Sequence, residues 1–192
     1  MFFLCSCQSK HEADCSSLLI DCQLLEEGDL ILRRGMGIGS RAVQHSDSQS
    51  AYSHIGILVC RSGKWMVVHC VPGEDAESGG EELIKCDSLT LFLRNDRAET
   101  GAVYRYDTLA EVRKNVAAKA LALSEKHIVF DHLYNLTDSN RMYCTELVNY
   151  VYDDVGIDIT EGRRHRMPGF KYPLIFPSDI INHLKVKEIQ RF

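Results

Sequence analysis

Two apolar runs rich in β-branched residues, at residues 54–60 and 65–71, form the strongest pattern in the chain, and a polar turn at residues 61–64 separates them. Such runs around a Ser-Gly turn predict an antiparallel β-hairpin. With a loop of two residues, His69 lies diagonally across from His54 on the same face of the hairpin. A register shifted by one residue would place the two imidazoles on opposite faces, so their proximity depends on the loop length.

The remaining periodicity predicts a mixed α and β protein. Residues 109–126 are rich in alanine, leucine, lysine and glutamate and predict an amphipathic helix. Shorter apolar runs predict strands at residues 30–33, 102–106 and 186–189. The proline-bounded segment 172–180 is expected to be extended and to lead into a short helix. Strands and helices are segregated along the chain, which indicates an α+β fold with an antiparallel sheet or partial barrel packed against helices.

A glycine-rich stretch at residues 35–40 invites comparison with phosphate-binding loops. It lacks the G-K-[ST] ending of a P-loop, and its glycine spacing differs from the dinucleotide-binding pattern. The stretch is therefore predicted to be a flexible loop beside a cleft, and no cofactor is expected.

A cysteine stands where another helix should begin. Apolar residues follow Cys144 at the spacing of one helical face until Gly156, and the candidate caps of this helix are Asp138, Ser139 and Asn140. In the first turn of a helix, unpaired amides and the dipole favour a thiolate over a thiol. The pattern predicts a nucleophilic cysteine, with a buried structural cysteine as the alternative.

A cysteine nucleophile needs a base, and the base needs a partner that orients it. His54 and His69 supply both from one predicted hairpin, although either histidine alone is more typical of a structural residue. The remaining histidines show no metal-ligand spacing, and the eight cysteines contain no C-x-x-C pair. No metal site is therefore expected, and Cys60 and Cys70 are expected to be small hydrophobic residues of the strands.

Composition narrows the classes of partner. The 192 residues carry 22 basic and 27 acidic side chains, intermingled to a net charge of -5, so nucleic acid is not expected as a partner. No run approaches the ~20 apolar residues of a membrane-spanning helix. The length suits one domain, assigned to residues 24–192.

Residues 1–23 are treated as a separate N-terminal segment. Its start, Met-Phe-Phe-Leu-Cys-Ser-Cys, looks like the end of a bacterial lipoprotein signal, with Cys7 as the favoured lipidated residue. On that interpretation the protein is anchored by lipid at the membrane, in the cell envelope or periplasm. The alternative is a chance resemblance and a cytoplasmic protein.

Four motifs occur in a distinctive order: Gly-Asp-Leu-Ile at 28–31, Tyr-Ser-His-Ile-Gly-Ile at 52–57, Tyr-Cys-Thr-Glu-Leu-Val at 143–148 and Phe-Pro-Ser-Asp-Ile at 176–180. With these motifs the chain resembles the permuted NlpC/P60 enzymes, specifically the YiiX/YaeF-like permuted papain-like amidases, which are related to lecithin retinol acyltransferase. The resemblance covers about residues 24–182. The histidine precedes the cysteine, which is the order of the circularly permuted papain-like fold.

The resemblance implies a role for each residue that matches. Cys144 is the nucleophile, His54 the base and His69 the orienting third member, with Glu74 as the alternative third member. Tyr143 is a candidate oxyanion donor or substrate contact, and a packing aromatic is its other interpretation.

The function expected is that of a papain-like cysteine amidase or peptidase. It would cleave an amide bond in a cell-wall peptide or an N-acylated substrate through an acyl-enzyme. The alternatives are an acyltransferase or lipid-directed thiol hydrolase, and a non-catalytic binding module. The expected partner is then a small-molecule, peptide or lipid-like acyl substrate. The sequence does not indicate an oligomeric state.

Overall fold

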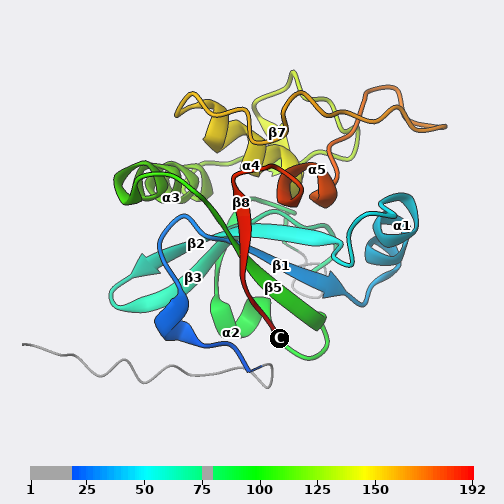
Figure 1. The fold of residues 1–192 in the computed structure, drawn as a ribbon. Helices are drawn as coiled ribbons and strands as arrows, with labels where there is room; N and C mark the ends of the chain where they lie inside the picture. The colour runs from blue at the N-terminus through cyan, green and yellow to red at the C-terminus, as the bar shows by residue number, and fades with distance from the viewer. Residues whose placement is uncertain (1–18, 75–79) are drawn as a thin grey trace, which may run out of the picture.

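The computed structural model describes residues 19–74 and 80–192. The proposed lipidation site Cys7, and most of the N-terminal segment with it, lies outside the described residues. The main sheet has six strands in the order β4-β3-β2-β1-β5-β8, and each pair of neighbours is antiparallel (Figure 1). Its strands are β1 (Leu30–Gly35), β2 (His54–Arg61), β3 (Lys64–His69), β4 (Lys85–Ser88), β5 (Ala98–Tyr106) and β8 (Val186–Arg191).

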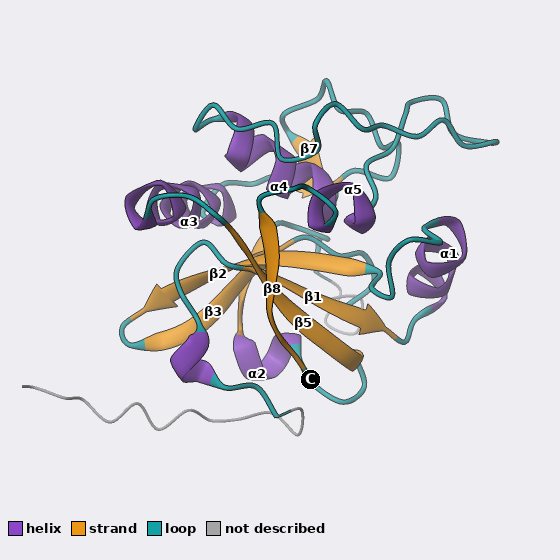
Figure 2. Ribbon diagram, in the orientation of Figure 1, coloured by secondary structure: helices purple, strands orange, loops and turns teal. Residues whose placement is uncertain are grey.

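Helices cover both faces of this sheet, so its strands are apolar on both sides. The elements outside the sheet are η1 (Cys22–Leu24), α1 (Ile38–Ser46), α2 (Leu89–Phe92), α3 (Ala110–Ser124), α4 (Cys144–Asp153), α5 (Pro177–Ile181) and a parallel pair, β6 (Val129–Phe130) with β7 (Arg141–Met142). Helices α3, α4 and α5 lie over one face and α2 lies over the other (Figure 2). In β1, Leu30 and Leu32 enter the core beneath α3 and α4, whereas Ile31 enters the core on the side of α2.

The hairpin that carries both histidines forms in the predicted register. Arg61 pairs with Lys64 across a two-residue turn in which both Ser62 and Gly63 have positive φ values, 48° and 76°. This is the backbone sign pattern of a type I′ turn, whose twist matches that of the strands. The turn fixes the register, and the register brings His69 to the face of His54.

Three local predictions are wrong. The glycine-rich stretch is not only a loop, because α1 begins at Ile38 within it. Helix α4 begins later than the candidate caps require, with Tyr143 at its N-cap position, and Asp138 instead accepts a hydrogen bond from Asn140 N in the preceding turn. Cys60 is in β2 but exposed, since it lies at the end of the strand beside the turn.

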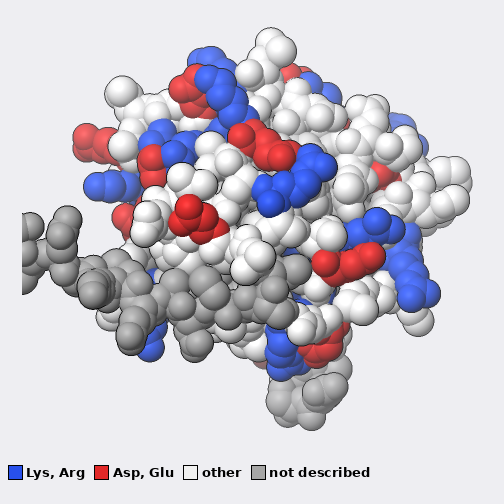
Figure 3. All heavy atoms as spheres, turned by 60° about the horizontal axis from the view of Figure 1, so that its bottom comes forward, with Lys and Arg blue, Asp and Glu red and all other residues white. Residues whose placement is uncertain are grey.

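On the face that Figure 3 shows, the basic side chains do not gather into a stripe. Figure 3 shows Lys and Arg side chains interspersed with Asp and Glu over the face in view. Among residues 19–74 and 80–192, no helix is both long and apolar enough to span a bilayer.

Candidate active site

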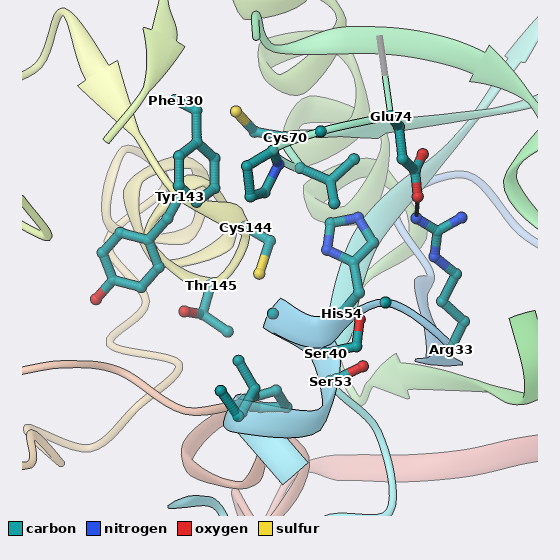
Figure 4. Close-up of a pocket in the computed structure, with 18 of the residues that line it drawn as sticks. Arg33, Ser40, Ser53, His54, Cys70, Glu74, Phe130, Tyr143, Cys144 and Thr145 are labelled. Carbon is teal, nitrogen blue, oxygen red and sulfur yellow. Dashed lines mark hydrogen bonds and ion pairs between the residues drawn. The ribbon is translucent and has the colours of Figure 1, made fainter. Parts of the chain in front are cut away.

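Cys144 is the first residue of α4 and lines a large pocket. Local bonds fix the start of this helix: the Glu146 carboxylate accepts from Tyr143 N at 3.3 Å, and Leu147 N donates to Tyr143 O at 2.9 Å. The side chain of Cys144 is partly exposed in the pocket wall, and Figure 4 shows it beside the His54 ring. The predicted position of the cysteine in the first turn is therefore confirmed.

The two histidines of the hairpin are in direct contact. His54 Nε2 and His69 Nδ1 are 2.9 Å apart, and the exposed fractions of the residues are 4% and 0%. Phe92 packs against both rings, with its centroid 5.6 Å from that of His54 and 5.0 Å from that of His69. This packing holds the imidazole pair rigidly beneath the pocket.

Sequence reasoning missed the carboxylate behind this pair. Asp87 Oδ2 lies 3.2 Å from His69 Nε2, and the strand β4 that carries it pairs with β3, so that Lys85 is opposite His69. Burial raises the pKa of Asp87, but its hydrogen bond to His69 and the charges of Lys85 and Arg97 outweigh burial, so that the pKa is lowered overall. Asp87 is therefore a carboxylate at neutral pH.

This carboxylate determines the tautomers of both rings. Because ionised Asp87 can only accept, His69 donates from Nε2 and its Nδ1 is an acceptor. His54 must then donate from Nε2 to His69, which leaves His54 Nδ1 without a proton. The ring nitrogen of His54 that remains available as a base is Nδ1.

The alternative third member, Glu74, belongs to a cluster of ion pairs beside the histidines. Within residues 19–74 and 80–192, its carboxylate pairs with Arg33, with Arg97 Nη1 at 2.7 Å and with Lys85 Nζ at 3.7 Å, and not with a histidine. Arg33 is 1% exposed, lies over the Phe92 ring at 4.5 Å and donates from Nη1 to Phe92 O at 2.5 Å. The group supports the floor of the site beside His54, as Figure 4 shows for Arg33 and Glu74.

Tyr143 lines the pocket, but its hydroxyl is engaged elsewhere. The backbone N–H of Ile175 donates to Tyr143 Oη at 2.9 Å, and Figure 4 shows the hydroxyl directed away from Cys144. Thr145 Oγ1 donates to Ile175 O at 2.8 Å from the same helix. These bonds fix the segment around Ile175 against the start of α4, so the geometry favours Tyr143 as a packing and positioning aromatic.

Burial keeps the cysteine and histidine neutral in the resting protein. Desolvation raises the pKa of Cys144 to about 11, although the backbone N–H groups of Ile55 and Thr145 act in the opposite direction. Desolvation, followed by the positive charge of Arg33, holds the pKa of His54 well below its ordinary value. Burial of Cys144 therefore opposes the thiolate that the amides at the start of the helix favour.

This electrostatic state predicts how Cys144 reacts with iodoacetamide in the substrate-free protein. Only the thiolate reacts, so the rate should rise about tenfold per pH unit and level off only near pH 11. At pH 7 the residue should react more slowly than free cysteine, whose pKa is ~8.5. Mass spectrometry of the alkylated peptide over the pH range measures this, and a flat rate between pH 5 and pH 8 would instead indicate a preformed ion pair.

The pocket is wide and mostly apolar. Its volume is about 730 Å³, and its walls come from α1, from residues 70–74 and Glu82 between β3 and β4, from the residues around β6 and from the segment that precedes α5. Cys144 and His54 lie between a wall with Phe130 and Tyr143 and a wall with Arg33 and Glu74, as Figure 4 shows. The reactive pair thus separates an apolar side from a charged side.

Comparisons with known proteins agree with this architecture. Residues 24–166 match the family model described as permuted papain-like amidase enzyme, YaeF/YiiX, C92 family. The chain belongs to this family of papain-like cysteine amidases. It is also similar to the crystal structure of yiiX from Escherichia coli O157:H7, with a TM-score of 0.70 and 19% identity over 87% of this chain and 97% of that one. That likeness confirms the fold, and a comparison with curated protein sequences gives no match.

The yiiX protein is described as a metalloprotein. In the part of this chain that the structure describes, no three His, Cys, Asp or Glu side chains are grouped so as to hold a metal ion. The residues at the site are those of thiol chemistry, with Cys144 and His54 in the pocket wall.

Proposed function

We propose that this protein hydrolyses an amide bond through a Cys144-His54-His69 triad and an acyl-enzyme. The observation that carries the proposal is the shared pocket of Cys144 and His54, together with the bond from the far nitrogen of His54 to His69. Membership of the amidase family supports the reaction class. The substrate remains one of the two classes expected from the sequence, a cell-wall peptide or an N-acylated compound.

The proposed reaction begins with a neutral pair. As the sulfur of Cys144 attacks the carbonyl carbon, His54 Nδ1 takes the thiol proton, and the oxyanion is stabilised by backbone N–H groups at the start of α4. The C–N bond then breaks, His54 gives its proton to the leaving amine, and the acyl group remains on Cys144 as a thioester. Water, deprotonated by His54, attacks the thioester, which releases the carboxylic acid and restores the thiol.

A generic acyl donor tests this scheme without the natural substrate. With p-nitrophenyl acetate, the protein should release a burst of p-nitrophenolate equal to the enzyme concentration, and mass spectrometry should locate the acetyl group on Cys144. Adding a primary amine distinguishes the alternatives, because an acyltransferase would form the acetylated amine instead of acetate. A protein that shows no acetylation of Cys144 would be a binding module.

The contacts of His69 and Asp87 predict graded losses of activity. His69→Ala should lower kcat for the ester about 100-fold, since His54 loses the partner that fixes its tautomer. Asp87→Asn should lower kcat about tenfold with KM unchanged, because an amide can donate to His69 and reverse the proton order of the pair.

Stopped-flow kinetics and a thermal melt measure both variants, and Asp107→Asn is the matched control. Asp107 is an exposed carboxylate whose partner is Lys187, at 2.7 Å. Equal loss of kcat in Asp107→Asn, or a rise in KM alone for Asp87→Asn, would contradict a positioning role. An unchanged kcat in His69→Ala would return Glu74 to consideration as the third member.

A further inference from the structure

Two segments of the chain carry cations without any acidic residue, although the protein has a net charge of -5. Residues 33–46 contain three arginines, and residues 162–178 contain three arginines and one lysine. The first segment ends with α1 and the second leads into α5, and both contribute residues to the pocket. Figure 1 shows α1 and the orange loop of the second segment on the right of the view. Positive charge is therefore concentrated on two neighbouring edges of the pocket.

The second segment projects a loop of defined geometry, residues 166–173. At its base, His165 and Leu174 exchange two backbone hydrogen bonds, at 2.9 and 2.8 Å. At its tip, Phe170 N donates to Met167 O at 3.2 Å across a Pro-Gly turn whose glycine has a positive φ. Proline followed by glycine of positive φ is typical of a type II turn. The loop thus presents its tip in one conformation.

Large apolar side chains are exposed on both segments. Met36 and Ile38, at the start of α1, are 49% and 89% exposed, and Phe170, at the tip of the loop, is 45% exposed. All three line the pocket, so they lie where it opens to solvent. None of the nine residues of α1 is buried. The exposed apolar side chains therefore do not stabilise the core, and their grouping is typical of an interaction surface.

Exposed cations accompany these apolar side chains. Arg41 follows Ile38 by three positions and is therefore its neighbour on the surface of α1. Arg166 and Lys171 lie in the loop on either side of the tip, and Lys171 Nζ is 5.0 Å from the centroid of the Tyr172 ring. The three cations are exposed and lie outside the pocket lining. Within the described ranges, none of them pairs with an acidic side chain.

We propose that this protein binds the surface of an anionic lipid bilayer through a docking rim, which consists of Met36, Ile38, Arg41, Arg166, Phe170 and Lys171. The apolar side chains enter the boundary between headgroups and acyl chains, and the cations contact the anionic headgroups. The pocket then opens toward the bilayer. This surface goes beyond the proposed reaction, which requires no docking.

A bilayer fits the docking rim better than an acidic protein does. An acidic peptide would match the three cations, but it would also need a separate socket for Ile38 and for Phe170, which project from different segments. A bilayer accepts an apolar side chain wherever that side chain enters. Charge and apolar exposure together therefore favour a lipid surface.

Co-sedimentation with vesicles tests the docking rim. The full chain should be used with Cys7→Ser, so that no lipid can be attached at the proposed lipidation site. It should bind vesicles of phosphatidylglycerol and phosphatidylcholine in equal parts at least about tenfold more tightly than vesicles of phosphatidylcholine alone. Raising the salt concentration from about 0.1 M to about 0.5 M should remove most of this difference.

Two variants connect the binding to the docking rim. Arg166→Glu should weaken binding to the anionic vesicles about tenfold, and Ile38→Ser about fivefold. Lys64→Glu is the control for charge, since Lys64 is an exposed cation at the turn between β2 and β3, on the left in Figure 1. Leu184→Ser is the control for apolar exposure, since Leu184 is also 89% exposed but does not line the pocket.

The controls should bind as the wild type does, and a thermal melt should show that all four variants are folded. The docking rim would be overturned by a lack of binding, by equal binding to both kinds of vesicle, or by losses in the controls as large as those in Arg166→Glu and Ile38→Ser. Tighter binding to a polyglutamate peptide than to the anionic vesicles would assign the rim to an acidic protein instead. Docking requires no thiol, so Cys144→Ala should bind vesicles normally, and failure of docking would leave the proposed reaction untouched.

Discussion

Replacing Cys144 with alanine is expected to abolish turnover of p-nitrophenyl esters, with a fall in kcat/KM of at least about 10⁴-fold. The reason is that the other cysteine among the described residues that line the pocket, Cys70, is buried, and burial followed by the charge of Cys144 raises the pKa of its thiol. Steady-state kinetics on the purified variant measures the loss.

The fold should survive this substitution. Cys144 is partly exposed, and the bonds that begin α4 come from Tyr143, Glu146 and Leu147. A thermal melt should therefore resemble that of the wild type, and Cys60→Ala, which removes an exposed thiol that does not line the pocket, should retain full activity. Undiminished turnover in Cys144→Ala would refute the nucleophile.

Replacing His54 with alanine is expected to lower kcat about 10³-fold with little change in KM. The resting thiol has a pKa of about 11, so without a base very little thiolate forms at neutral pH. The variant should also acquire a different pH profile, in which the residual rate rises with hydroxide concentration up to about pH 11. The wild type should lose activity only when the pH falls below the depressed pKa of His54, where the imidazole takes a proton.

The control for this variant is His127→Ala. His127 is an exposed histidine whose ring pairs with Glu81 at 3.2 Å on the surface. Its loss should leave both kcat and the pH profile unchanged. A wild-type kcat in His54→Ala would contradict the role of general base. If His54→Ala instead unfolds in the thermal melt, His54→Gln separates the loss of packing from the loss of proton transfer.

The sequence predicted the parts of the site that depend on local contacts. The pairing of His54 with His69 follows from one hairpin whose two-residue turn fixes the register, so that β-strand alternation alone brings them together. The place of Cys144 follows from the apolar periodicity of α4 and its end before Gly156. Both inferences needed contacts only between residues close in sequence.

The remainder of the site depends on contacts between distant segments. Asp87 reaches His69 through the pairing of β4 with β3, and no tight turn joins these strands to fix their register. The pocket walls come from α1, from the residues near β6 and from the segment before α5, which no periodicity places together. The rise in the pKa of Cys144 could not be predicted for the same reason, because burial is a tertiary property whereas the amides at the start of a helix are local.

The neutral resting thiol also bears on the chemical durability of the enzyme. Peroxides and disulfides attack the thiolate, and the thiol form is almost inert toward them. With a pKa of about 11, Cys144 carries a negligible thiolate fraction at neutral pH. The nucleophile is therefore protected from sulfenic acid formation between turnovers, and it becomes reactive only while His54 removes its proton during attack on a bound carbonyl.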